Sequence, residues 1–119
     1  MIIRDKHTVA KIKRQLFELL IQEHAFWSYE PASINIDIID DDQIIALTLR
    51  YLDIPDINRL FTIYPKRKIK NAWKNHLVPE SEFLYTLNRF LAWYYFKAKN
   101  PDTYIKNLQT RHLNHLIGA

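Results

Sequence analysis

The chain has 119 residues, no cysteine and a single glycine, Gly118. Its 48% apolar fraction is enough for one compact domain of this length, so we predict a single domain over residues 1–119. The absence of cysteine excludes disulfides, thiolate metal sites and a thiol nucleophile, and it favours a reducing compartment. The near-absence of glycine excludes phosphate-cradling loops, whose backbones need residues without a Cβ.

The net charge of +4 is unevenly distributed along the chain. Residues 28–64 carry two basic and seven acidic side chains, whereas residues 65–119 carry ten basic and three acidic ones. Such a distribution could steer an anionic partner to one part of the protein. The longest apolar run, Phe90–Phe96, has seven residues, far fewer than the ~20 that a membrane span needs. We therefore expect a soluble, cytoplasmic protein with no signal peptide.

The first predicted helix has Thr8 as its cap and extends to about Ala25 or Trp27. Apolar residues recur along it at steps of three and four: Val9, Ile12, Leu16, Leu19 and Leu20. Phe26 and Trp27 follow where this helix should end, and we predict that both rings insert into the core.

Isoleucines alternate with polar residues in the next segment, Ser33–Ile39. We predict an extended segment anchored by these isoleucines, with a short strand as the alternative. The run Asp40-Asp41-Asp42 suits the amide-rich start of a helix, so the second helix is predicted at about residues 42–52.

Two prolines mark the next boundaries. Asp53 is a capping residue and Pro55 fits a first helical turn, which predicts a third helix that Pro65 then ends. Pro65 also opens a short fourth helix over residues 65–76. On a helical wheel its inner arc holds Ile69, Ala72, Trp73 and His76, and its basic arc holds Lys66, Arg67, Lys70 and Lys74.

Ser81 is the predicted cap of a fifth helix that continues to about Lys99 and is apolar on almost every side. Asn100-Pro101-Asp102 then starts a sixth helix. The predicted fold is all-α: about six helices in an orthogonal array around a central aromatic-rich helix.

No residue pattern indicates catalysis or a bound cofactor. None of the three serines lies in a nucleophile elbow, and the aspartate run lacks the spacing and glycine of a calcium loop. His112 and His115 have a spacing that metal sites use, but the H-E-x-x-H arrangement is absent. We predict a protein that is not an enzyme and that holds no metal or cofactor.

The fourth helix is the stronger of two candidate surfaces. Residues 65–76 contain five basic side chains and no acidic one, and two short helices meeting at Tyr64-Pro65 resemble a helix-turn-helix in outline. Lys66, Arg67, Lys70 and Lys74 are therefore candidates for contact with nucleic acid or another anion. An ordinary solvated helix face is the alternative.

The aromatic run 90–96 is the other candidate surface. Its rings suit the core of the domain, but Trp and Tyr are also enriched in protein interfaces. The candidate interface residues are Phe90, Trp93, Tyr95 and Phe96. Either a partner protein or a second copy of the chain could dock there.

Residues 26–77 resemble a family of small uncharacterised bacterial helical proteins. The matching positions are Phe26-Trp27, Pro31, Ile44-Ile45, Tyr51 through Asp56, Leu60, Tyr64 and Ile69-Lys70. Members of that family are often encoded beside nucleotidyltransferase toxins of the AbiEii type, which implies an antitoxin-like or regulatory role. The sequence thus predicts a non-enzymatic, antitoxin-like or adaptor protein that acts through protein contact. The alternative is a DNA-binding regulator that uses the basic helix 65–76.

Overall fold

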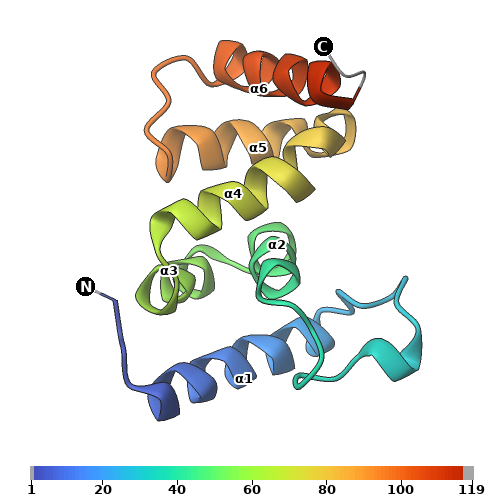
Figure 1. The fold of residues 1–119 in the computed structure, drawn as a ribbon, viewed down its shortest axis with the longest axis vertical. Coiled ribbons are helices and arrows are strands. Elements are labelled where there is room, and N and C mark those ends of the chain that lie inside the picture. Colours follow the sequence, from blue (N-terminus) through green and yellow to red (C-terminus); the bar gives the residue numbers. More distant parts are fainter. Residues whose placement is uncertain (1, 117–119) are drawn as a thin grey trace. The chain divides into compact units, whose positions relative to one another are not determined.

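The computed structural model describes residues 2–116, and every regular element in that range is helical. The elements are α1 (Lys6–Gln22), η1 (Pro31–Ser33), α2 (Asp41–Tyr51), α3 (Ile54–Ile63), α4 (Lys66–His76), η2 (Val78–Glu80), α5 (Ser81–Tyr94) and α6 (Pro101–Leu116) (Figure 1). The all-α prediction is confirmed for the described residues. The chain divides into two compact units, residues 1–72 and 73–119, with the boundary inside α4. The orthogonal array of about six helices in one domain stays a prediction.

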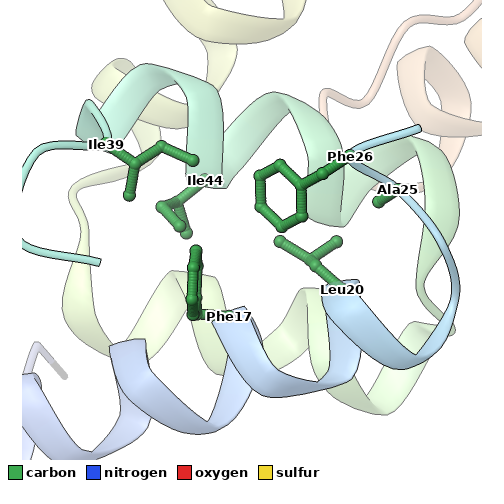
Figure 2. Packing of buried hydrophobic residues seen from close by; sticks show 6 residues of the cluster. All are labelled: Phe17, Leu20, Ala25, Phe26, Ile39 and Ile44. Atoms are coloured by element: carbon green, nitrogen blue, oxygen red, sulfur yellow. The ribbon is translucent and has the colours of Figure 1, made fainter. Parts of the chain in front are cut away.

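The core of the first unit forms where the chain turns back after α1. His24 has a left-handed backbone with φ of 57°, which redirects the chain two residues after the helix ends. Phe26 then packs beside Phe17, with ring centroids 5.3 Å apart, close to Leu20 and Ile44 (Figure 2). The prediction that Phe26 enters the core is confirmed.

Trp27 does not follow Phe26 into this core, because its side chain is 75% exposed. The sequence prediction for this ring was wrong. The reason is that α1 ends at Gln22, earlier than predicted, and the residues after it form turns.

The start of α1 also differs from the prediction, in which Thr8 was the cap. Asp5 is the cap, and its carboxylate accepts hydrogen bonds from the Thr8 amide (3.2 Å) and the Thr8 hydroxyl (2.6 Å).

Ser33 is the last residue of η1 and residues 36–38 form a turn, so both the extended prediction and the strand alternative for this segment were wrong. The Asn35 side chain accepts a hydrogen bond from the Asp37 amide at 2.9 Å, and the Asn35 carbonyl accepts one from the Ile39 amide at 3.0 Å. These local bonds close a turn that an extended segment cannot form. Ile39 is buried as a result, whereas Ile38 is 66% exposed.

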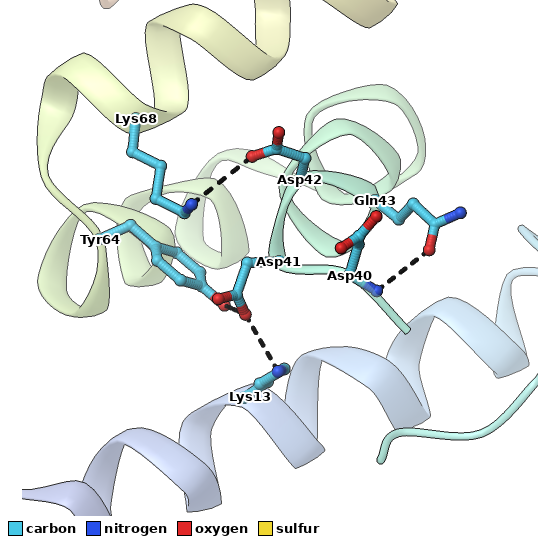
Figure 3. Close-up of polar contacts among 7 residues, drawn as sticks. All are labelled: Lys13, Asp40, Asp41, Asp42, Gln43, Tyr64 and Lys68. Carbon is cyan, nitrogen blue, oxygen red and sulfur yellow. Dashed lines mark hydrogen bonds and ion pairs between the residues drawn. The ribbon is translucent and has the colours of Figure 1, made fainter. Parts of the chain in front are cut away.

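The aspartate run starts α2, as predicted. Asp40 and Gln43 form a capping box, in which the Asp40 amide donates to the Gln43 side chain at 3.1 Å. Asp41 accepts a hydrogen bond from the Tyr64 hydroxyl at 2.7 Å and pairs with Lys13 at 3.0 Å (Figure 3). This carboxylate therefore joins α1, α2 and the residue that follows α3 within the first unit.

The pKa values of Asp41 and Tyr64 are shifted in opposite directions. Burial by itself would raise the pKa of the Asp41 carboxyl, but the Tyr64 hydroxyl and the Lys13 ammonium outweigh it, and the pKa is lowered. Burial, followed by the neighbouring Asp41 carboxylate, raises the pKa of Tyr64.

The predicted start of α3 is confirmed, because Asp53 occupies the cap position of this helix and Pro55 lies in its first turn.

The second unit is organised around a buried polar network. The indole of Trp73 donates to the Asn88 side-chain oxygen at 3.0 Å. The Asn88 amide nitrogen donates to the Leu77 carbonyl at 2.9 Å and to the Ser81 hydroxyl at 2.8 Å. The Ser81 hydroxyl in turn donates to the Val78 carbonyl at 2.7 Å. Ser81 is therefore an internal link in this network and not the cap of α5.

The aromatic-rich helix α5 ends at Tyr94, not near Lys99 as predicted. Lys97 has a left-handed backbone with φ of 54°, which is incompatible with a continuing helix. The chain returns as α6, whose first turn is capped by the Asn100 side chain (3.2 Å from the Thr103 amide). Helices α5 and α6 run side by side in opposite directions (Figure 1).

Candidate interaction surfaces

Three rings near the end of α5 form a cluster at the surface, which we call the aromatic face: the half-buried Phe90 and the exposed Trp93 and Tyr94. The rings of Phe90 and Tyr94 are stacked, with centroids 5.2 Å apart and planes inclined by 14°. Trp93 lies beside both, at 6.4 Å from Phe90 and 6.0 Å from Tyr94. The side chain of Trp93 is 59% exposed and that of Tyr94 is 47% exposed. The helix thus presents a continuous aromatic surface to solvent.

Helical spacing explains why this face is separate from the core. Positions 90, 93 and 94 are three and four residues apart, so they share one side of α5. Asn88, Leu91 and Ala92 lie on the other side and are buried. Within the second unit, α5 therefore buries one side and exposes rings on the other.

The predicted interface residues differ in their exposure, and one of them lies in the core. Trp93 is exposed and Phe90 is half-buried. Tyr95 is half-buried and meets Tyr94 edge to face at 4.8 Å; burial, followed by the neighbouring Tyr94, raises its pKa. Phe96 was wrongly assigned, because it is 7% exposed and packs on Trp73 at 4.8 Å.

Tyr94 was missing from the predicted interface. Its spacing from Phe90, four residues on a helix, is the signal that could have identified it.

The basic face of α4 comprises Lys66, Arg67, Lys70 and Lys74. The first two side chains are exposed and the last two are half-buried. Their helical positions share one arc, as the wheel predicts, and the arc is a property of this single continuous helix. The remaining basic residue of the first turns, Lys68, is paired with Asp42 at 3.7 Å (Figure 3).

The opposite side of α4 is buried, with one exception. Ile69, Ala72 and Trp73 are fully buried, as predicted. His76 was predicted to be an inner position but is exposed, because the buried side of the chain continues instead through Leu77.

A groove of about 260 Å³ lies within the second unit, between the last residues of α4 and the second half of α6. Its lining residues are Lys74, Asn75, Leu108, Arg111 and His112. A larger hollow of about 450 Å³ in the first unit is lined by α1 and the turn after η1, including His7, Lys11 and Asp37.

Among residues 2–116, no three histidine, aspartate or glutamate side chains gather as a metal site would require. The side chain of His115, half of the histidine pair in the sequence, lies outside the described residues. No helix in the described part of the chain has both the length and the apolarity needed to cross a bilayer.

Comparisons with protein-family models, curated proteins and solved structures gave no match to this chain. The family resemblance of residues 26–77 therefore stays a prediction, and the function is argued from the two surfaces alone.

Proposed function

We propose that this chain is a non-enzymatic, antitoxin-like or adaptor protein that docks a partner protein on the aromatic face of α5. The observation that carries the proposal is the cluster of the exposed Trp93 and Tyr94 rings with the half-buried Phe90, which stacks on Tyr94. Large aromatic side chains at a protein surface are the residues that dominate binding energy in protein interfaces. Burying them against a partner would remove apolar area from water.

The size and charge of this face suit the centre of an interface. Aromatic side chains bury about 150–250 Å² each, so the exposed parts of Trp93 and Tyr94 offer about 250 Å² together. That is about a third of the ~800 Å² that each partner contributes to a standard interface. Residues 90–96 carry no charged side chain, and interface centres are likewise depleted in charge.

The chain provides a matched control for the experiment. Trp27 is 75% exposed in the other unit, so it tests whether any exposed tryptophan retains proteins non-specifically. The wild type, Trp93→Ser/Tyr94→Ser and Trp27→Ser are immobilised, and proteins captured from a lysate of the native cells are compared by quantitative mass spectrometry. We expect a defined protein that the wild type and Trp27→Ser retain and that the double variant loses. Equal retention by all three chains would contradict the proposal.

A second function, binding of DNA by the basic face of α4, is favoured by a separate observation. Four cationic side chains share one arc of α4, and no acidic residue occurs in residues 65–76. Cations on one helix side can meet successive phosphates, whose neutralisation releases counterions and makes the affinity salt-dependent.

The two functions are distinguished by salt and by charge reversal. If DNA is the ligand, duplex binding measured by fluorescence anisotropy should weaken steeply between 50 and 200 mM salt, and Lys70→Glu/Lys74→Glu should abolish it. Binding to a protein on the aromatic face should respond little to salt. Failure of the wild type to bind a duplex at low salt would exclude the DNA function.

A further inference from the structure

We propose that the groove between the end of α4 and α6 is a binding site for a phosphate group. The site lies entirely within the second unit and is lined by Lys74, Asn75, Leu108, Arg111 and His112. It is a different surface from the aromatic face and does not depend on the docking of a partner protein there. It shares one residue, Lys74, with the basic face of α4 and takes its other cation, Arg111, from α6.

The chemistry of the lining residues is that of an anion site. Lys74 supplies an ammonium, Arg111 a guanidinium and His112 an imidazole, and Asn75 adds an amide donor. Nitrogen donors from two helices thus face one hollow, and a guanidinium can bind two oxygens of the same phosphate.

No carboxylate competes for these cations in the described part of the chain. The second unit contains three acidic residues, Glu80, Glu82 and Asp102, and none of them lines the groove. Asp102 is occupied by Arg89, whose guanidinium lies 3.0 Å from its carboxylate. Among the residues that the structure describes, neither Lys74 nor Arg111 has an ion pair.

The groove is held in place by the core directly beneath it. Trp73, the residue before Lys74, is fully buried and stacks on Tyr104 of α6, with centroids 6.2 Å apart and planes inclined by 10°. Leu108, one turn before Arg111 and His112, is also buried. These contacts anchor the end of α4, residues 73–76, against α6, so the backbone segments that carry Lys74 and Arg111 are both attached to the core of the second unit.

The volume limits what the groove can hold. About 260 Å³ is below the 300–1,000 Å³ of sites that enclose a whole drug-sized ligand. It suits a phosphate group with part of its substituent. The phosphate could belong to a nucleic-acid backbone or to a small polyphosphate, and the test distinguishes these two sources.

The test uses the full chain and two probes, tripolyphosphate and a 12-nucleotide oligothymidylate, each titrated calorimetrically at 50 mM salt. The groove variant is Lys74→Gln/Arg111→Gln. The matched control is Lys99→Gln/Lys106→Gln, which removes the same charge from two exposed positions of the same unit that do not line the groove. Circular dichroism confirms that both variants are folded.

We expect the groove variant to lose at least tenfold in affinity for one or both probes, because it removes two charge-assisted hydrogen-bonding groups. The control should lose less than threefold. A loss for oligothymidylate alone would assign the phosphate to a nucleic-acid backbone, and a loss for tripolyphosphate would assign it to small polyphosphates as well. Equal losses in the two variants, or no binding of either probe to the wild type, would overturn the proposal.

Discussion

The buried network around Asn88 makes the sharpest prediction about the stability of the second unit. Replacing Asn88 with alanine removes three hydrogen bonds, those with the Trp73 indole, the Leu77 carbonyl and the Ser81 hydroxyl. Two of the three groups keep another partner, because the Leu77 carbonyl also accepts from the Glu80 amide and the Ser81 hydroxyl donates to Val78. The Trp73 indole, which is fully buried, is the group that loses the acceptor of its N–H.

The cost follows from this count. A buried donor left without a partner costs about 1–3 kcal/mol, and each of the other two lost bonds costs about 0.5–1.5 kcal/mol. We therefore expect Asn88→Ala to lower the free energy of unfolding by about 2–6 kcal/mol, a large part of the 5–15 kcal/mol typical of a domain.

A double-mutant cycle with Trp73→Phe isolates the indole bond, because phenylalanine has no N–H to leave unpaired. Urea unfolding followed by far-ultraviolet circular dichroism gives the four free energies. Asn88→Ala should cost about 1–2 kcal/mol less in the Trp73→Phe background than in the wild type. An equal cost in both backgrounds, or a cost below about 1 kcal/mol in the wild type, would refute the reasoning.

Three further predictions concern single side chains. Phe96→Ala should lower the free energy of unfolding by about 3–5 kcal/mol, whereas Trp93→Ala should lower it by less than about 1 kcal/mol. The reason is that the Phe96 ring lies in the core and the Trp93 ring does not. Similar losses of the two variants in urea unfolding would contradict this assignment. Thr48 has a fully buried hydroxyl with no hydrogen-bond partner in the described part of the chain. Thr48→Val should therefore raise the free energy of unfolding by about 1 kcal/mol and raise the thermal midpoint with it. A lower midpoint would contradict this prediction. The lowered pKa of Asp41 stabilises the fold above the unfolded carboxyl pKa of about 4, and this contribution is lost as the pH falls through the lower folded value. The stability difference between the wild type and Asp41→Asn should therefore be present at pH 7 and shrink towards pH 2, and a difference independent of pH would disprove the linkage.

Local signals in the sequence predicted most helix starts. Asp40 and Gln43 are three residues apart, and Asp53 precedes Pro55, so each pattern identifies a helix start without knowledge of the tertiary structure. The same holds for Asn100 before α6. These signals are readable because they belong to a helix's own first turn, where the backbone amides have no intrahelical partner.

Helix ends were harder to predict, and the errors in the candidate sites followed from them. The left-handed residues His24 and Lys97 come just after α1 and α5, and neither is the glycine that usually marks such a position. Extending the helices past these points placed Trp27 in the core and Phe96 on the surface of α5. The groove beside Lys74 could not be predicted, because it depends on the packing of α4 against α6.

The measurement that tests the central claim most directly is the affinity of a purified captured partner for two tryptophan variants. Removing a side chain at the centre of an interface costs about 2 kcal/mol or more, which corresponds to about a 30-fold loss of affinity. Calorimetric titration should therefore show a loss of at least about 30-fold for Trp93→Ser and less than about threefold for Trp27→Ser. Equal affinities of the two variants for the partner would contradict the assignment of the aromatic face of α5 as the docking surface.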